Sequence, residues 1–455
     1  MTEIGARLQP LLLGALGIVI AGGVAYALVN PPPMRAAYLD FNSFYCAAGI
    51  LSRGQDPYRY EPLHSCEIRN LHPVTPNAVV PAPLPPYAIA AFMPFTKLSY
   101  PRAQFAWWLV LIAGAAVILG ALLALTGLPL LLIGTCVSIS ILLPSLIVGS
   151  LALVPIALLS LSGLAIVRQR WVGAAVLQGA ACIEPHLALP VLVATFAFVP
   201  QMRPRLAFIG ALLLAASIAA APIPLGIEYL TKVLPAHAVS EINNGEQYAL
   251  SATLHAFGLS EPLSVSIGEA QYALFALAGL WTVARVRNQL PESVVFVPMA
   301  LAVMGGPFVH LTQIGAALPL ALIVAARTRS APAWAAVALL AIAIPWQAAI
   351  GYGGVLAGLV LFAILSYNRI PWPSAVAAAI TAGIVLQVLQ LPEIINRRFV
   401  SIASVPPATL AELPWRQLAS QFSPTPFSWY GHVLIYAAFT CAYCALLVPW
   451  RVEHA

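Results

Sequence analysis

The sequence predicts an all-α protein that crosses a membrane many times. Its hydrophobic fraction is 61%, its charged fraction is only 8% and its mean hydropathy is +0.90. An ordinary soluble domain carries about 25% charged residues. The continuous apolar stretches have the length of transmembrane helices, about 20 residues, whereas a membrane β-barrel shows alternating segments of about 10 residues.

Apolar segments alternate with basic residues along the whole chain. The segments cover 10–29, 83–97, 103–125, 129–147, 149–167, 172–200, 206–225, 268–286, 291–309, 312–326, 332–351, 353–367, 373–391 and 431–449. Basic residues mark the cytoplasmic ends of such segments. We therefore expect about 12–14 crossings with both termini in the cytoplasm. If 103–125, 129–147 and 149–167 all span, Arg168 and Arg170 fall on the outer side, so one of these three segments should be short, broken or re-entrant.

Three polar stretches fall on the outer side in this topology. They are 30–82, 227–266 and 392–430. The segment Leu11–Val29 is expected to remain as the first span, because no small-residue cleavage site follows it. The chain divides into a module over 1–330, which holds the first two outer loops, and further helices over 331–455, which hold the third.

The sequence lacks the motifs of several enzyme classes. It contains no phosphate-binding loop, no dinucleotide fingerprint and no metal-binding cysteine pattern. The net charge of +6 is spread over segment ends, which does not indicate a nucleic-acid partner. Any chemistry is therefore expected at the outer membrane surface or inside the helical bundle.

The chain has two aspartates, Asp40 and Asp56, and both lie in the first outer loop. Apolar residues at helical spacing predict a short amphipathic helix that starts at Asp40, lies along the interface and ends near Gly54. Asp40 either caps this helix or serves as a general base whose pKa is raised by partial desolvation. Asp56 precedes a proline and is interpreted as a turn residue.

Two cysteines, Cys46 and Cys66, flank the same loop. They form a disulfide if the loop faces an oxidising compartment, but the spacing alone leaves the pairing open. The cysteines in apolar segments are interpreted as small core residues.

Other polar residues in apolar surroundings are candidates for function. Glu184 and His186 flank a proline and serve either a functional site or the freed backbone groups. The stretch 228–259 is either a lid that holds a sugar or phosphate or a solvated cap, and its candidate substrate-binding residues are Lys232, His237, Gln247 and Tyr248. His310 lies at a Gly-Gly-Pro break, either as a core residue or as a partner of Asp40.

Two stretches carry a resemblance to a known family. DFNSFYCAAGILSRGQDPY, from Asp40 to Tyr58, resembles the family 87 glycosyltransferases, which include polyprenol-phosphate-mannose-dependent mannosyltransferases. LIVGSLALVPIALLSLSGLAIVRQRWVGAAVLQGAACIEPHLALP resembles the central segment of that family. Gly149-Ser150 stands where Gly-Gln is usual, and Glu184-Pro185 stands where Lys-Pro is usual, so no cationic role is transferred there. The resemblance covers residues 9–330.

This resemblance implies a GT-C fold, a helical bundle with juxtamembrane helices outside the cytoplasm and a catalytic first outer loop. It implies an inverting hexosyltransferase that moves one mannose-like hexose or pentose from a polyprenyl-phosphate donor to a lipid or glycan acceptor. Asp40 matches the catalytic acid of the family's loop and His310 looks like the family's histidine in a later outer loop. The site is then on the outer face of the plasma membrane.

The expected reaction needs a base and a cation. Asp40 removes a proton from the acceptor hydroxyl. His310, Lys232, Arg53 and Arg59 are the candidates that offset the charge of the leaving polyprenyl phosphate. No cofactor and no metal are expected, because no carboxylate-rich metal cage is apparent.

Two other functions remain open at this level. A secondary transporter has a similar number of helices, but transporters place polar groups at the bilayer midplane. A ligase for lipid-linked glycans uses the same kinds of residues at the outer face. A cavity open to lipid at Asp40 favours the transferase, and a sealed midplane cavity favours the transporter.

Overall fold

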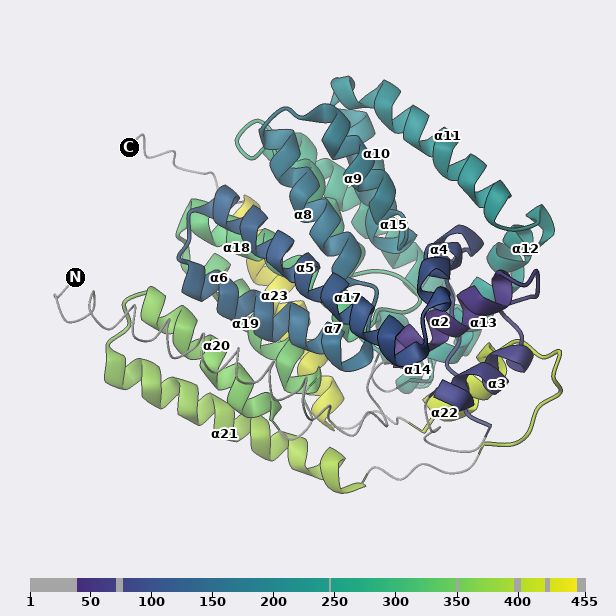
Figure 1. Ribbon diagram of the computed structural model, residues 1–455. Helices are drawn as coiled ribbons and strands as arrows, with labels where there is room; N and C mark the ends of the chain where they lie inside the picture. The colour runs from purple at the N-terminus through teal and green to yellow at the C-terminus, as the bar shows by residue number, and fades with distance from the viewer. Residues whose placement is uncertain are drawn as a thin grey trace.

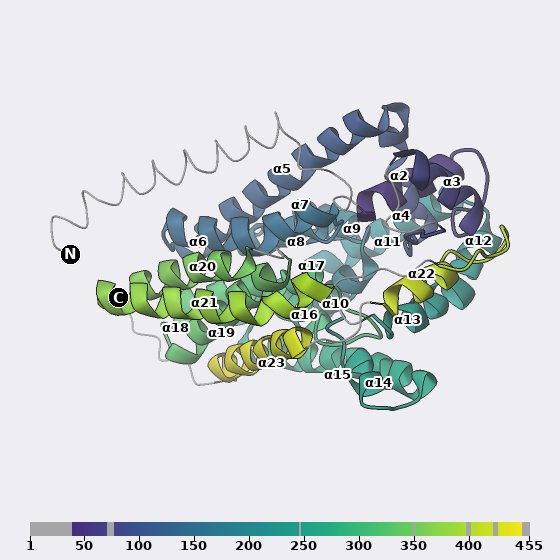
Figure 2. The same ribbon diagram turned by 90° about the horizontal axis from the view of Figure 1, so that it is seen from below.

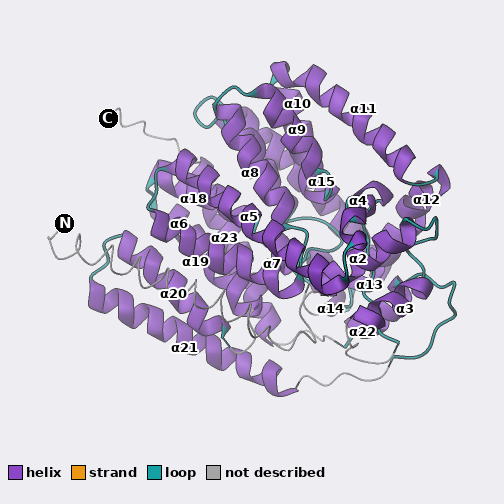
Figure 3. Ribbon diagram, in the orientation of Figure 1, coloured by secondary structure: helices purple, strands orange, loops and turns teal. Residues whose placement is uncertain are grey.

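The computed structural model describes residues 39–70, 77–244, 247–348, 352–396, 402–421 and 426–447. These residues are almost entirely helical and contain no strand (Figure 3). The expected all-α class is therefore confirmed for the described residues. The predicted first span, Leu11–Val29, lies outside them.

The helices follow one another with short connections (Figure 1). Up to residue 202 they are α2 (Leu39–Leu51), α3 (Tyr60–Asn70), α4 (Pro86–Ala90), the 3₁₀ turn η1 (Met93–Lys97), α5 (Tyr100–Thr126), α6 (Leu130–Val137), the π turn η2 (Ser138–Leu142), α7 (Leu143–Val148), α8 (Leu153–Val167), α9 (Trp171–Ala181), α10 (Pro185–Phe198) and the 3₁₀ turn η3 (Pro200–Met202). Then come α11 (Arg203–Ala220), α12 (Ile223–Glu228), the π turn η4 (Tyr229–Val233), α13 (Leu234–Glu241), α14 (Leu250–Ala256), α15 (Glu261–Val286), α16 (Ser293–Ala302), α17 (Leu311–Ile314), α18 (Ala317–Thr328), α19 (Ala331–Ala348), α20 (Gly353–Tyr367), α21 (Trp372–Asn396), α22 (Glu412–Ala419) and α23 (Pro426–Leu447).

Six helical segments of the described residues are long and apolar enough to cross a membrane. They are Tyr100–Thr126, Leu130–Val148, Pro200–Ala220, Glu261–Val286, Leu311–Thr328 and Trp372–Leu389. Their outward faces carry large apolar side chains, and Phe208 and Leu214 on α11 are each 64% exposed. Such faces are stable against lipid chains and not against water. The chain is therefore built as a helical membrane protein.

Three predicted apolar segments differ from the structure. The segment 83–97 forms only α4 and η1, each of five residues, because prolines interrupt it. The segment 172–200 is two helices, α9 and α10, which separate at Cys182–Glu184 just before Pro185. The segment 291–309 is helical only over Ser293–Ala302. The short segment expected among 103–125, 129–147 and 149–167 is the last of the three, where α8 covers only the 15 residues Leu153–Val167.

Short helices gather at one end of the long ones (Figure 2). We call the group of α2, α3, α4, α12, α13 and α22 the cap. Distant parts of the chain meet there, since Arg59 pairs with Leu410 in an isolated bridge and the amide of Ala411 donates to the carbonyl of Tyr58. The first and third predicted outer loops are therefore parts of one structure.

Helix α2 is buried rather than amphipathic. It starts at Leu39 and is followed by Gly54 at φ +71°, close to the predicted limits. The prediction of an amphipathic helix with one solvent-exposed face is wrong, since most side chains of α2 are buried. Phe41 is fully buried and stacks on Trp107 of α5 with ring centroids 5.5 Å apart. The polar side is buried as well: Asn42 is only 3% exposed, and its amide donates to the carbonyl of Glu67 in α3.

A disulfide joins the first two helices of the cap. Cys46 of α2 and Cys66 of α3 are bonded, with Cα atoms 5.7 Å apart. The four cysteines Cys136, Cys182, Cys441 and Cys444 are free. The fold therefore decides the pairing that the spacing left open.

Replacing Cys46 with serine should lower the stability of the protein. The bond closes a loop of 20 residues, and its loss is expected to cost about 3 kcal/mol of unfolding free energy. The measurement is the thermal unfolding midpoint of the detergent-solubilised chain. Cys444→Ser is the matched control, because Cys444 is free and exposed. Equal midpoints for both variants and the wild type contradict the prediction.

Candidate functional site

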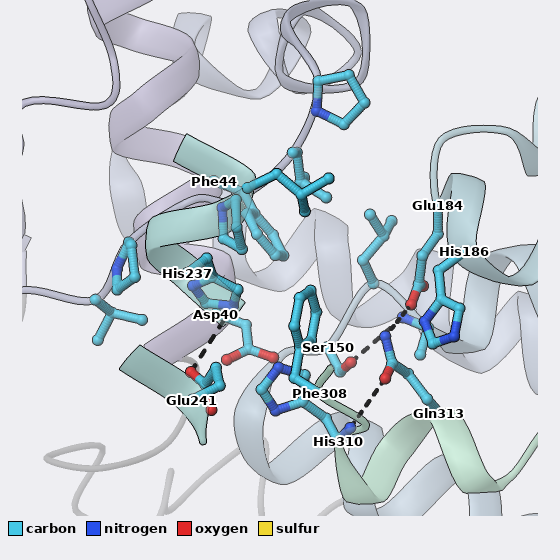
Figure 4. A pocket seen from close by; sticks show the side chains of 18 of the residues that line it. Asp40, Phe44, Ser150, Glu184, His186, His237, Glu241, Phe308, His310 and Gln313 are labelled. Carbon is cyan, nitrogen blue, oxygen red and sulfur yellow. Dashed lines mark hydrogen bonds and ion pairs between the residues drawn. The ribbon is translucent and has the colours of Figure 1, made fainter. Parts of the chain in front are cut away.

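A cavity of about 1510 Å³ lies where the cap meets the long helices. Its described lining includes five carboxylates, three histidines and no lysine or arginine; these ionisable residues are Asp40, Glu67, Glu184, His186, His237, Glu241, Glu269 and His310. The rest of the wall is mainly apolar. Figure 4 shows two acidic walls, with Asp40 and Glu241 on one side and Glu184 on the other.

Asp40 lies in the first turn of α2 and forms part of the cavity wall. No hydrogen bond reaches its carboxylate from the described residues, so the interpretation as a helix cap finds no support there. Burial raises the pKa of Asp40 to about 7, and the charges of Glu241 and Glu184 act in the same direction while His237 opposes them. A carboxyl group with this pKa exchanges a proton readily near neutral pH.

Glu241, at the end of α13, is fully buried beside Asp40 (Figure 4). Its carboxylate accepts three hydrogen bonds from the described residues. The indole of Trp415 donates to Oε1 at 2.5 Å, and the amides of Asn244 and Gln247 donate to Oε2 at 3.1 and 2.5 Å. Burial works against the charge, but attraction to the protonated forms of His310 and His237 and the hydrogen bonds from Trp415 and Asn244 outweigh it, so the pKa of Glu241 is lowered. Glu241 is therefore an ionised, fixed group.

His237 lies one helical turn before Glu241 and sits between two carboxylates. Its Nε2 is 3.8 Å from Glu241, and its Nδ1 is 3.6 Å from Glu412 of α22. Burial disfavours the charged imidazole, but Glu412 and Glu241 outweigh burial and raise the pKa of His237. His237 is therefore the histidine of the cavity whose protonated form the neighbouring carboxylates favour.

His310 has a defined tautomer because of Gln247. The amide of Val309 donates to Gln247 Oε1 at 2.8 Å, which fixes the orientation of the glutamine side chain. Gln247 Nε2 then lies 3.1 Å from His310 Nδ1 and acts as the donor. Burial lowers the pKa of His310. The neutral ring therefore carries its proton on Nε2.

The segment that carries His310 packs tightly on α15. The amide of Gly306 donates to the carbonyl of Gly268 at 3.0 Å. Gly306 has φ +130°, which favours glycine, and a Cβ on Gly305 would lie 2.5 Å from the Cα of Tyr272. The two glycines of the Gly-Gly-Pro break thus allow this segment to lie directly against the backbone of α15, which determines where His310 lies in the cavity wall.

The opposite wall forms around Glu184, just before α10. Its Oε1 accepts a hydrogen bond from Gln313 Nε2 at 2.6 Å. Gln313 Oε1 in turn accepts from the backbone amide of His310 at 2.9 Å. The nearby ring of His186 is bound to the carbonyl of Ala302, at 2.8 Å from Nε2. His186 thus forms a hydrogen bond with a backbone carbonyl at the end of α16, while Glu184 faces the cavity.

The structure brings some predicted site residues together and separates others. Asp40, His310, His237 and Tyr248 line the cavity, and Gln247 bonds to His310. Arg53, Arg59 and Lys232 are not among the lining residues. Arg59 is held by Asp56 at 2.7 Å and by Glu228 at 2.5 Å, and Lys232 is exposed and 3.6 Å from Glu228.

Several site residues were not predicted. Glu412 lies 3.6 Å from His237, Trp415 donates to Glu241, and Gln313 donates to Glu184. The only sequence signal for Glu412 and Trp415 is their place in a polar outer stretch. Their partners in the cavity lie too far along the chain for spacing to reveal the contact.

His237, Glu241 and His310 are close enough to hold a metal ion, with one ligand atom from each within 4.8 Å of the others. Their hydrogen bonds fit that use poorly. Glu241 Oε2 and His310 Nδ1 are both occupied by Gln247. A metal on His310 Nε2 would require a proton on Nδ1, which would face another donor.

Comparisons with family models, with curated proteins and with solved structures find no match to this chain.

Replacing Gly305 with alanine should destabilise the protein by about 1–3 kcal/mol, since the new methyl group meets backbone on α15. Gly134→Ala is the matched control, because nothing lies within 4 Å of a Cβ there and alanine stabilises a helix by about 0.5–1 kcal/mol relative to glycine. Thermal unfolding in detergent measures both. A Gly305→Ala variant as stable as Gly134→Ala contradicts the packing described above.

Proposed function

We propose that the chain is an inverting glycosyltransferase of the membrane, with a GT-C-type fold. It moves a single sugar from a polyprenyl-phosphate donor to a hydroxyl of a lipid or glycan acceptor. The observation that carries the proposal is Asp40, a carboxylate without a hydrogen bond among the described residues, in the wall of a large cavity. The resemblance of its surrounding stretch to the family 87 glycosyltransferases supports the same reaction.

In this reaction Asp40 accepts the proton of the acceptor hydroxyl. The acceptor oxygen forms a bond to the anomeric carbon, and the bond from that carbon to the phosphate oxygen breaks. The electron pair leaves with the polyprenyl phosphate. Because the pKa of Asp40 is raised to about 7, the carboxylate is a stronger base than an ordinary aspartate.

The histidines have separate roles in this proposal. His310 offers an Nε2–H, since Gln247 occupies its Nδ1. It donates to an oxygen of the substrate and does not need to be charged. His237, held between Glu241 and Glu412, supplies the positive charge near the leaving phosphate. Arg53, Arg59 and Lys232, which lie outside the cavity lining, are not needed for this step.

The wall of the cavity suits a substrate with a long apolar chain. Part of it consists of apolar side chains that are more than half exposed; they are Leu189, Leu214, Ile218, Ile223, Ile227 and Leu230, on α10, α11, α12 and η4. In a membrane these side chains face lipid. A polyprenyl chain can therefore remain in the bilayer while its sugar phosphate reaches Asp40. A nucleotide-sugar donor would gain nothing from such a wall.

The cap supports a site on the outer side of a plasma membrane. Its disulfide, Cys46–Cys66, is of the kind that persists in oxidising compartments. The cavity is lined by residues of the cap, and the cap lies at one end of the long helices (Figure 2), which favours the transferase over the transporter. We keep the prediction that both termini are cytoplasmic.

Replacing Asp40 with asparagine should reduce sugar transfer by about 10²–10⁴-fold, because asparagine cannot accept the proton. The measurement is transfer from radiolabelled polyprenyl-phosphate sugars in membranes, per folded molecule. The matched control is Asp56→Asn in the same stretch, since Asp56 is bound to Arg59 and lies outside the cavity lining. It should keep its transfer rate. Full transfer by Asp40→Asn, or no transfer by the wild type from any polyprenyl donor, overturns the proposal.

The transfer rate should also depend on pH. Asp40 acts as a base only when ionised, so kcat/KM should fall as the pH drops through about 7, the pKa of Asp40. An aspartate with an ordinary pKa of about 3.9 would leave the rate constant over this range. Steady-state kinetics between about pH 5 and pH 9 test the point. A flat profile contradicts the role of Asp40.

A further inference from the structure

A second polar group faces the same cavity from the wall opposite Asp40 (Figure 4). Glu184 is only 8% exposed, and its carboxylate oxygens are unequal. Oε1 accepts the hydrogen bond from Gln313, whereas Oε2 has no partner among the described residues. A buried carboxylate oxygen without a partner is unfavourable, because the water that it loses is not replaced. The empty position is therefore suited to a ligand.

The orientation of Glu184 is set by a chain of hydrogen bonds. Gln313 donates to Glu184 and accepts from the backbone amide of His310. His310 is itself bound to Gln247 through its ring. The free oxygen of Glu184 is thus held at a constant position relative to His310, and a ligand does not have to order it on binding.

The groups beside Glu184 indicate the chemistry of the ligand. Ser150 and Thr312 also line the cavity, with their hydroxyl oxygens 2.9 Å apart. Phe308 lies between the two acidic walls (Figure 4). A carboxylate rejects phosphate but accepts hydrogen bonds from hydroxyl groups. A neutral ring that carries several hydroxyls and has one apolar face matches this set, and a sugar is such a ring.

We propose that Glu184, with Ser150 and Thr312, forms a subsite that binds the hydroxyl groups of a neutral sugar ring lying against Phe308. The inference rests on the proposed glycosyl transfer and adds to it the group that recognises the sugar. The sugar is either the one on the polyprenyl-phosphate donor or one on the acceptor. Glu184 is then a residue that determines specificity, while Asp40 performs the proton transfer.

The first experiment measures binding alone. The full chain in lipid nanodiscs is titrated with the methyl glycosides of mannose, glucose, galactose and arabinose, and binding is followed by saturation-transfer NMR. At least one glycoside should bind to the wild type, and Glu184→Gln should weaken it about tenfold, since a charge-assisted hydrogen bond becomes a neutral one. The substitution keeps an oxygen for Gln313, so the fold should survive. Thermal unfolding checks that it does.

A control variant and a double-mutant cycle distinguish direct recognition of the sugar by Glu184 from an indirect effect on the structure. Glu61→Gln removes the same charge at a position outside the cavity lining and should bind like the wild type. Deoxy analogues of the bound glycoside remove one hydroxyl each. The analogue that lacks the hydroxyl bound by Glu184 should bind the wild type more weakly than the parent glycoside does. With Glu184→Gln the analogue and the parent should bind almost equally, because the variant has already lost the interaction between Glu184 and that hydroxyl.

Transfer kinetics then identify the source of the sugar. A rise in KM for the donor alone assigns the subsite to the donor sugar, and a rise for the acceptor alone assigns it to the acceptor. Unchanged KM values for both overturn the subsite. No binding of any glycoside to the wild type, or equal binding by Glu184→Gln, also overturns it. Binding that depends on Glu184 without any sugar transfer would contradict the proposed function and leave the subsite standing.

Discussion

The cap depends on the buried charge of Glu241. Three donors from two parts of the chain converge on its carboxylate: Asn244 and Gln247 follow α13, and Trp415 lies in α22. A buried carboxylate is stable only when it is hydrogen-bonded or paired, so these donors must be in place for the charge to remain. Through these hydrogen bonds Glu241 connects α13 to α22 and to Asn244 and Gln247. Gln247 extends this network to His310.

The negative charge of Glu241 also changes the pKa values of Asp40 and His237. Because Glu241 stays ionised, it opposes the ionisation of Asp40 and favours the protonation of His237. Asp40 receives no hydrogen bond from the described residues, and the charge of His237 offsets this effect only in part. Two carboxyl groups in one cavity thus hold their protons differently: one is fixed as an anion and the other titrates near neutral pH. Such a pair is what acid–base chemistry at a membrane surface requires.

The two aspartates of the first outer stretch have different positions for the same kind of reason. Asp56 accepts hydrogen bonds from the amide of Tyr58 and from Arg59, at 2.9 and 2.7 Å. Arg59 also forms an ion pair with Glu228, which joins the stretch to the end of α12. The carboxylate of Asp56 is therefore occupied by structural hydrogen bonds, whereas that of Asp40 remains available to a substrate.

The sequence by itself determined the membrane class, the long helices and the helix that begins at Asp40, because hydropathy and helix signals are local. Spacing also drew attention to His310 and to the proline at Glu184–Pro185. It did not reveal that Glu184 meets Gln313, 129 residues away, or that Glu241 meets Trp415, 174 residues away. It left the pairing of Cys46 with Cys66 open, and it offered Arg59 as a residue that binds substrate. Only the tertiary structure decided these points, since burial and hydrogen bonding between distant segments set which polar groups are satisfied and which face the cavity.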